Sequence, residues 1–191
     1  MNPTKALLND CLDDNRKAHY DLYKLCFPFI LGICRRYYRN KEDGMATLNM
    51  VFLKVIKNLS SYLKKDHIPF EVWVRRITIN TIIDEFRKDS TYRKIIDQGS
   101  IEHFEENHSD ERPELSIDTE EILLAVNQLP EMNRQVFNLY VIDGYKHDEI
   151  AGMLGISPST SKVHLFKARR ILRQMVDDFN KNSETVKRVL S

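Results

Sequence analysis

The strongest constraint on this chain lies in residues 145–173, YKHDEIAGMLGISPSTSKVHLFKARRILR. Gly155 can adopt the left-handed backbone that a tight turn between two helices requires. Before that turn, the small side chain of Ala151 leaves room for a second helix to cross closely. After it, Ser157 can cap the next helix and Pro158 suits its first turn. The segment therefore predicts a helix-turn-helix, with Ile156 filling the core between its two helices.

The second helix of this motif is basic. Lys and Arg occupy five of its positions, and no acid occurs before Asp177. Val163, Phe166 and Ile171 are spaced so that one face can pack while the other meets solvent. The N-terminal half of such a helix enters the major groove of DNA. The predicted DNA contacts are Ser159, Thr160, Ser161, Lys162, His164, Phe166, Lys167 and Arg169. A basic, solvated helix in a domain that binds only protein is the alternative.

Apolar residues recur every three or four positions along most of the remaining chain, which predicts amphipathic helices. The expected helices cover residues 20–37, 45–59, 69–88, 122–129 and 131–143. Pro28 predicts a kink in the first. The last should bury Val136, Leu139 and Tyr140 and end at Gly144. β-branched residues make a strand conceivable over 69–88, but the length and the helical spacing of the arginines favour a helix. The predicted fold class is all-α.

Charge divides the chain into three parts. Residues 1–96 hold 18 Lys and Arg against 11 Asp and Glu, a net charge of +7, whereas residues 97–118 hold eight acids against Arg112 alone. Residues 90–118 also lose the helical periodicity and contain Gly99 and Pro113, which is typical of a solvated linker. We therefore predict two small helical domains, 1–92 and 119–191, joined by a flexible acidic linker, 93–118. The overall charge of +1 hides the basic first domain.

Several classes of protein are disfavoured by what the sequence lacks. The longest apolar stretch, residues 27–34, is too short to span a bilayer, so no membrane insertion and a cytoplasmic location are expected. No nucleotide-binding loop or metalloprotease motif is present, which predicts no enzyme activity, no cofactor and no metal. The six histidines lack ligand spacing and are expected at the surface. Cys11, Cys26 and Cys34 are interpreted as buried apolar side chains, with a redox or metal pair of Cys26 and Cys34 as the alternative.

Residues 127–170 resemble region 4 of the sigma-70 family, and especially its extracytoplasmic-function group. That group has a Leu-Pro, an Arg with an aromatic residue three positions on, a Gly, a Glu-Ile-Ala, a Leu-Gly-(Ile/Val)-Ser, and basic residues ending in Lys/Arg-Ala-Arg. The matching positions here are Leu129, Pro130, Arg134, Phe137, Gly144, Glu149, Ile150, Ala151, Leu154, Gly155, Ser157, Thr160, Lys162, Lys167, Ala168 and Arg169. The usual Thr-Val-Lys-Ser order is replaced by Thr160-Ser161-Lys162-Val163, so base readout is expected to differ from that of relatives.

A second motif separates this family from response regulators, many of which end in a similar helix-turn-helix. Residues 70–90, FEVWVRRITINTIIDEFRKDS, resemble regions 2.3 to 2.4 of the sigma-70 family, with Phe, Trp, basic residues, Ile, Asn, Asp and Arg at the family's spacing. Together with the helix before them, the two motifs cover most of residues 20–180. Because they occur in the family's order, the chain is identified as a member.

The resemblance implies a sigma factor that binds core RNA polymerase and directs promoter-specific transcription initiation. Residues 119–191 would bind the −35 element of promoter DNA as duplex, and residues 1–92 would bind polymerase and hold the opened −10 element. The implied −10 contacts are Trp73, Arg75, Arg76, Asn80, Asp84, Arg87 and Lys88. Asn80 and Asp84, one helical turn apart, could form one polar pocket, whereas Trp73 is expected to serve as core packing rather than base stacking.

The helix over residues 45–59 would contact core polymerase through Asn49, Met50, Phe52, Leu53 and Lys54. Here the family's acidic and glutamine-containing pattern is replaced by residues 46–51, Ala-Thr-Leu-Asn-Met-Val, so this surface is less charged than in relatives. The resemblance also implies an anti-sigma factor as a partner. The acidic linker is either a spacer or a segment that follows basic polymerase channels. A conventional helix-turn-helix regulator and an adaptor without DNA binding remain the alternatives.

Overall fold

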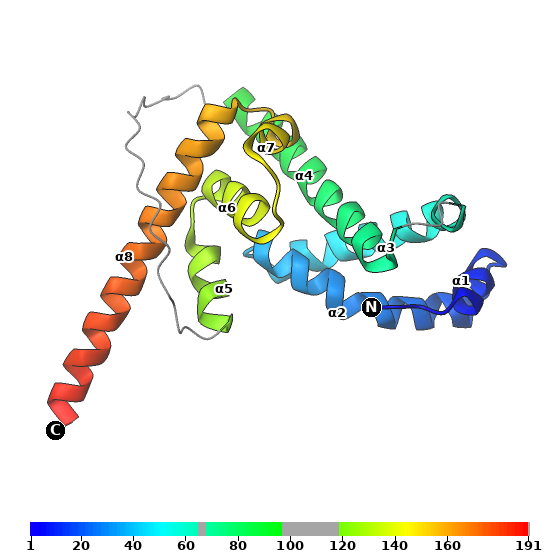
Figure 1. The fold of residues 1–191 in the computed structure, drawn as a ribbon, viewed down its shortest axis with the longest axis horizontal. Coiled ribbons are helices and arrows are strands. Elements are labelled where there is room, and N and C mark those ends of the chain that lie inside the picture. The colour runs from blue at the N-terminus through cyan, green and yellow to red at the C-terminus, as the bar shows by residue number, and fades with distance from the viewer. Residues whose placement is uncertain (65–67, 97–118, 191) are drawn as a thin grey trace. The chain divides into compact units, whose positions relative to one another are not determined.

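The computed structural model describes residues 1–64, 68–96 and 119–190, and it divides into two compact units, Met1–Gln98 and Gly99–Ser191. Every regular element within the described ranges is helical (Figure 1), so the predicted all-α class is confirmed. None of these helices combines the length and the apolar character needed to cross a membrane. The predicted linker lies mostly outside the described residues, and its first four positions, 93–96, form the end of a helix.

The first unit contains four helices: α1 (Lys5–Leu12), α2 (Arg16–Tyr37), α3 (Lys41–Leu63) and α4 (Phe70–Ile96). The periodicity of apolar residues did not predict α1, although Thr4 was available as a cap and accepts a hydrogen bond from the Leu7 amide at 3.2 Å. Asn15 caps α2 in the same way, and Asn40 caps α3. α2 continues through Pro28, and the kink predicted there remains a prediction.

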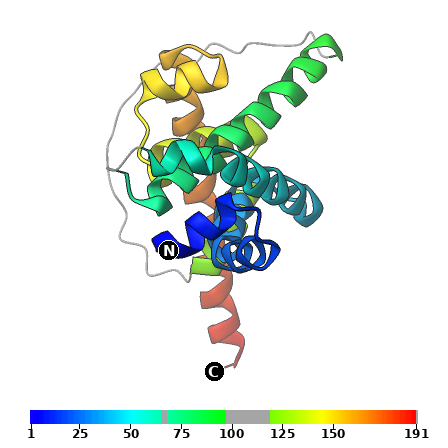
Figure 2. The same cartoon turned by 90° about the vertical axis from the view of Figure 1, so that its right-hand side faces the viewer.

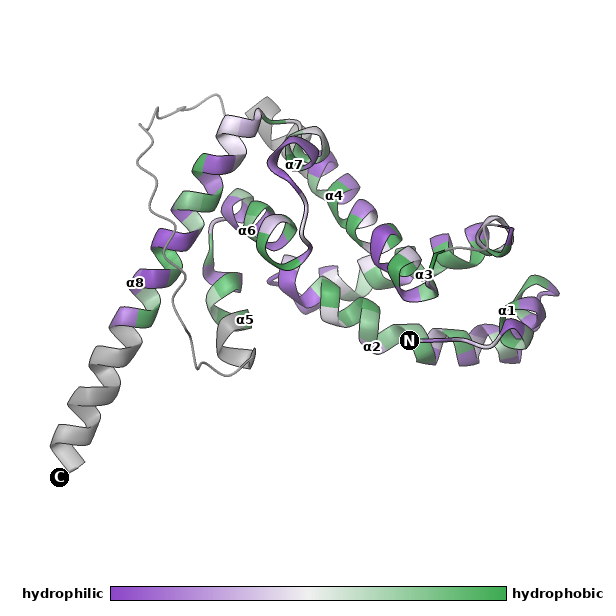
Figure 3. Ribbon diagram, viewed as in Figure 1, coloured by the Kyte–Doolittle hydropathy of each residue, from purple (hydrophilic) through white to green (hydrophobic). Residues whose placement is uncertain are grey.

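The core of the first unit lies between α2, α3 and α4, which pack against one another. Each helix buries one apolar stripe, and Figure 3 shows this alternation of polar and apolar residues along α4. The β-branched residues Val74, Ile79, Ile82 and Ile83 of α4 are part of this core. The hydroxyls of Thr78 and Thr81 donate to main-chain carbonyls one turn earlier, at 2.8 and 2.7 Å. Burial of each large apolar side chain contributes about 1.5–3 kcal/mol. The fully buried set includes Leu22, Cys26, Ile30, Leu48, Val51, Val55, Leu59 and Val74.

The second unit contains α5 (Thr119–Gln128), α6 (Glu131–Phe137), the π-helical turn η1 (Asn138–Ile142), α7 (His147–Leu154) and α8 (Pro158–Leu190). Val126, Leu129 and Ala168 form a buried cluster. Arg134 is also buried and donates from Nη1 to the Asn127 carbonyl at 3.2 Å, which joins α6 to the end of α5. In Figures 1 and 2 the last turns of α8 extend past the helices that pack on its first half.

The single helix predicted over residues 131–143 is instead an α-helix followed by the π-helical turn η1. Val136 and Leu139 are buried as predicted, but the prediction for Tyr140 was wrong, because this side chain is 36% exposed. A π-helical turn holds an extra residue, so it shifts the phase of the side chains that follow. Gly144 has φ +77°, which confirms the predicted left-handed end of this segment.

Candidate nucleic-acid interface

The helix-turn-helix predicted from residues 145–173 is present as α7, a tight turn and α8. Gly155 closes α7 with φ +67°, and its amide donates to the Ala151 carbonyl at 2.9 Å. The Ser157 hydroxyl accepts a hydrogen bond from the Thr160 amide at 3.0 Å, and α8 begins at Pro158. These contacts confirm the predicted roles of the turn glycine, the capping serine and the first-turn proline. Ile156 is half-buried beside them.

The first half of α8 has one buried face and one exposed basic face. The buried face contains Ser161, Leu165 and Ala168, and it packs against α6 and α7. We define the basic face of α8 as the exposed residues Lys162, Phe166, Arg169, Arg170 and Arg173.

Phe166 was predicted to pack, but its side chain is 55% exposed, so that part of the prediction was wrong. Leu165, its neighbour in sequence, is the residue that reaches the core, because adjacent positions on a helix point about 100° apart. Val163 and Ile171, the two other positions expected to pack, are half-buried. The basic face therefore carries an aromatic ring among its cations.

Two of the predicted DNA contacts on α8 face the interior of the unit. Ser161 is 0% exposed, and its Oγ lies 2.9 Å from Nδ1 of His147, the first residue of α7. His164 is half-buried and donates from Nδ1 to Oδ1 of Asn133 on α6, at 2.7 Å. Direct contact of Ser161 with DNA would require α8 to leave its packing. Ser159, Thr160, Lys162, Phe166, Lys167 and Arg169 are exposed or half-buried on α8.

The two histidines in these contacts were expected at the surface, and this expectation was wrong for both. The ring of His147 stacks on Tyr140 with 4.4 Å between ring centroids and an angle of 20°. Burial lowers the pKa of His147, Lys162 and Arg169 lower it further, and Asp148 opposes them. Burial also lowers the pKa of His164, and Lys167 adds to the effect. Both rings are therefore neutral near pH 7.

On α4, the predicted −10 residues fall into two groups. Arg76, Asn80, Asp84, Arg87 and Lys88 are exposed and recur at helical spacing, and we define them as the polar face of α4. The Arg75 guanidinium instead lies over the ring of Phe29 on α2, 5.3 Å from its centroid. Trp73 is half-buried and stacks on Tyr62 of α3 with 4.5 Å between centroids. This stack agrees with the interpretation of Trp73 as a packing residue.

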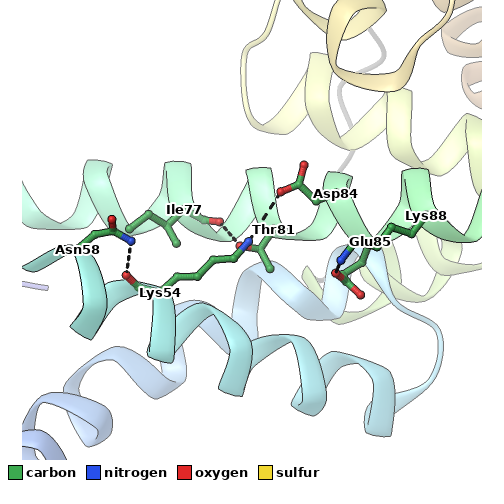
Figure 4. Close-up of polar contacts among 7 residues, drawn as sticks. All are labelled: Lys54, Asn58, Ile77, Thr81, Asp84, Glu85 and Lys88. Atoms are coloured by element: carbon green, nitrogen blue, oxygen red, sulfur yellow. Dashed lines mark hydrogen bonds and ion pairs between the residues drawn. The ribbon is translucent and has the colours of Figure 1, made fainter.

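Figure 4 shows how α3 reaches the polar face of α4. Nζ of Lys54 lies 3.7 Å from Oδ2 of Asp84, and Asn58 donates to the Lys54 carbonyl at 2.7 Å. Farther along α4, Lys88 and Glu85 form a second ion pair at 2.7 Å. Both pairs are substantially exposed, so their contribution to stability is small. Lys54 was predicted to contact polymerase, whereas in this structure its ammonium group lies beside the carboxylate of Asp84.

The other predicted polymerase contacts lie along the surface of α3. Asn49 is exposed, and its Oδ1 accepts a hydrogen bond from the Tyr23 hydroxyl of α2 at 3.3 Å. Phe52 is half-buried and meets the Tyr23 ring edge-on, with 5.0 Å between centroids. Met50 is half-buried, and Leu53 is 68% exposed. Uncharged side chains of α2 and α3 therefore contact one another at this surface.

The cysteines behave as buried apolar side chains. Cys11, Cys26 and Cys34 are free and buried. Burial raises the pKa of Cys26 and of Cys34 to about 12, so neither is a thiolate near neutral pH. Among the described residues there is no group of three or more His, Cys, Asp or Glu side chains that could hold a metal ion.

Comparisons with known proteins match both units. The family described as Sigma-70 region 2 matches residues 22–91, and Sigma-70, region 4 matches residues 119–172. RNA polymerase sigma factor SigZ of Bacillus subtilis (strain 168) is 30% identical over 130 residues, which are 68% of this chain and 70% of that protein. The chain belongs to the sigma-70 family. It is a sigma factor of RNA polymerase, and the alternative of a conventional helix-turn-helix regulator is not favoured.

Other relatives agree with this assignment and with the extracytoplasmic-function group. RNA polymerase sigma factor SigV of Bacillus subtilis (strain 168) is 24% identical over 170 residues, covering 89% of this chain and 91% of that protein. ECF RNA polymerase sigma factor SigM of the same organism is 25% identical over 152 residues, covering 78% and 86%. Sigma factors are in general initiation factors rather than enzymes.

Sequence reasoning missed several residues of this sigma factor that support the candidate interfaces. Asn133 contacts His164 of α8, and Tyr140 stacks on His147 of α7. Tyr23 contacts Phe52 of α3, and Tyr62 stacks on Trp73 of α4. Each of these contacts joins two helices that are distant in sequence or separated by a turn. The only local signal was a polar or aromatic residue on a predicted amphipathic helix, which does not indicate its partner.

Proposed function

We propose that this sigma factor reads the −35 element as duplex DNA through the basic face of α8. The observation that carries the proposal is the one-sided distribution of charge on that helix. Lys162, Arg169, Arg170 and Arg173 are all exposed, while Ser161, Leu165 and Ala168 are buried on the opposite side. Cations on one helix face can reach the phosphates on both sides of a major groove while the side chains between them reach base edges.

The polar face of α4 is the corresponding candidate for the opened −10 element. Arg76, Arg87 and Lys88 supply cations for the backbone of a single strand, and Asn80 and Asp84 offer hydrogen-bonding groups for unpaired bases. Lys54 contributes to this proposal because its ion pair places a cation beside the Asp84 carboxylate. A paired carboxylate repels DNA phosphate less than an isolated one.

The surface formed by α2 and α3 is the candidate contact with core polymerase. Leu53 is its most exposed apolar side chain, and Asn49, Met50 and Phe52 are uncharged residues near it on α3. Contacts of this kind gain affinity mainly from apolar burial. An anti-sigma factor as a further partner is an expectation from the family resemblance, and action in the cytoplasm without covalent chemistry is an expectation from the sequence.

Run-off transcription with core polymerase tests the proposal. Core enzyme plus this protein should give a discrete product from a promoter selected out of a genomic fragment library, and core enzyme alone should not. The double variant Lys162→Glu/Arg169→Glu should lose that product. Lys5→Glu, which reverses an exposed charge on α1, is the matched control and should retain it. Duplex binding with no polymerase-dependent product would instead support a conventional regulator.

A further inference from the structure

We propose that the contacts His147–Ser161 and Asn133–His164 set the rotational orientation of α8 about its own axis, and that these four residues thereby position the side chains that read the −35 element. This inference rests on the proposed function of α8. Ser161 and His164 were candidates for DNA contact, and here they act through the helix rather than by touching DNA.

The two contacts hold α8 from two different helices. Ser161 meets His147 at the start of α7, at 2.9 Å, and His164 meets Asn133 of α6, at 2.7 Å. Ser161 and His164 are three residues apart on α8, so they lie on the same side of the helix, Ser161 buried and His164 half-buried. The stack of His147 on Tyr140 of η1 orients the histidine ring from a third element.

The apolar part of the same interface leaves rotation about the helix axis less tightly defined. Leu165 and Ala168 are buried, but apolar burial is non-directional, whereas hydrogen bonds weaken steeply when their geometry changes. Ala168 also presents only a methyl group. The contacts of Ser161 with α7 and of His164 with α6 are directional and therefore add what apolar burial does not supply.

Helix orientation matters because base recognition tolerates little displacement. A rotation of about 20° moves the surface of a helix of radius about 6 Å by roughly 2 Å. A shift of that size breaks a hydrogen bond to a base edge, because the donor–acceptor distance of such a bond varies by only a few tenths of an ångström. Attraction to phosphates depends on charge rather than exact geometry, so it would persist. Loss of orientation should therefore reduce sequence discrimination more than overall DNA binding.

The test uses holoenzyme made from core polymerase and the full chain, with a transcribed promoter randomised over its −35 element as the probe. Two quantities are measured: the total DNA retained at fixed salt, and the enrichment of preferred −35 sequences over the input. Ser161→Ala and Asn133→Ala should retain DNA within about twofold of wild type while lowering enrichment about tenfold. The double variant should lower enrichment further.

A conservative variant supplies the control for a merely structural role. Asn133→Asp keeps an oxygen acceptor of nearly the same shape for Nδ1–H of His164, so it should restore most of the enrichment that Asn133→Ala loses. The added negative charge should also raise the pKa of His164, which histidine NMR measures directly. Helical content by circular dichroism identifies any variant that fails to fold. If Asn133→Ala does not fold, the single variants Ser161→Ala and Asn133→Asp still test the positioning role.

The outcomes separate this inference from the function on which it rests. If wild-type holoenzyme shows no enrichment at −35, the proposed function of α8 fails. If wild type enriches and folded Ser161→Ala and Asn133→Ala enrich equally well, the positioning role is overturned. A parallel loss of retention and enrichment in folded variants also overturns it, because an orientation effect spares phosphate binding.

Discussion

The exposed faces of α8 and α4 differ in how their charges are arranged. On α8 every charged side chain from Pro158 to Val176 is a cation, and the first acid is Asp177. On α4, Asn80 and Asp84 separate the cation Arg76 from Arg87 and Lys88, and a lysine of α3 pairs with the acid. A uniformly basic stripe suits the dense phosphates of a duplex, whereas mixed polar groups suit unpaired bases on a single strand.

The two faces also differ in how they are supported. The basic face of α8 is opposite a buried side that holds two hydrogen bonds to other helices. The polar face of α4 is opposite a side of buried β-branched residues such as Ile79 and Ile82. The hydroxyls of the neighbouring Thr78 and Thr81 donate to main-chain carbonyls of the same helix. We attribute the orientation of α8 to these directional contacts, whereas the buried side of α4 offers mainly apolar packing. Four predictions test this comparison.

The largest expected effect is the loss of duplex binding when the basic face of α8 is reversed in charge. Lys162→Glu/Arg173→Glu should weaken −35 duplex binding more than a hundredfold at low salt, because it replaces two cations with two acids. The slope of log affinity against log salt should fall by about 0.9 for each phosphate contact removed. Fluorescence anisotropy of labelled duplex over a salt series measures both. An unchanged slope would show that these residues make no phosphate contacts.

A smaller effect is expected from the polar face of α4. Asn80→Ala should weaken holoenzyme binding to a single-stranded −10 oligonucleotide by about tenfold, since it removes a hydrogen-bonding partner of an enclosed base. Duplex −35 binding should stay at the wild-type level. Asn58→Ala, which changes another exposed amide beside Lys54, is the matched control. Equal losses on both DNA forms would contradict the division of labour between the two helices.

A still smaller effect is expected from the exposed ring of Phe166. Apolar side chains in the major groove contact the C5-methyl group of thymine. Replacement of thymine by uracil within the −35 element should weaken wild-type binding by about fivefold at one position, and Phe166→Ala should remove that sensitivity. The same thymine-to-uracil change outside the −35 element serves as the control. If the variant and wild type respond alike at every position, Phe166 does not read thymine.

The smallest expected effect is a pH dependence of stability confined to the second unit. His147 and His164 have lowered pKa values in the folded chain, against an ordinary value of 6.5. Well above pH 6.5 both histidines are neutral in the folded and in the unfolded state, so they do not change the free energy of unfolding. As pH falls below 6.5 the unfolded state binds protons that the folded state refuses, so the second unit loses stability toward the lower folded values. Hydrogen exchange at pH 7.5 and 5.5 measures this, and His147→Gln/His164→Gln should flatten the response.

The sequence by itself determined the elements that depend on one or two turns of chain. Gly155, Ser157 and Pro158 specify the turn and the start of α8 through left-handed backbone, a capping hydroxyl and a preset φ. Apolar periodicity was enough to predict the described α-helices other than α1, and two motifs in order were enough to identify the family. The missed helix α1 is short, and its cap at Thr4 preceded no long apolar repeat.

Only the tertiary structure decided which side chains face solvent and which hold the helices in place. Leu165 and Phe166 are both apolar neighbours, and only the packing of α6 and α7 on α8 determines that the first is buried and the second exposed. Ser161, His164 and Lys54 have polar groups that could meet DNA or polymerase, and their partners come from other helices. Sequence periodicity gives the spacing of a face but not its neighbours, because those are brought together only when the chain folds.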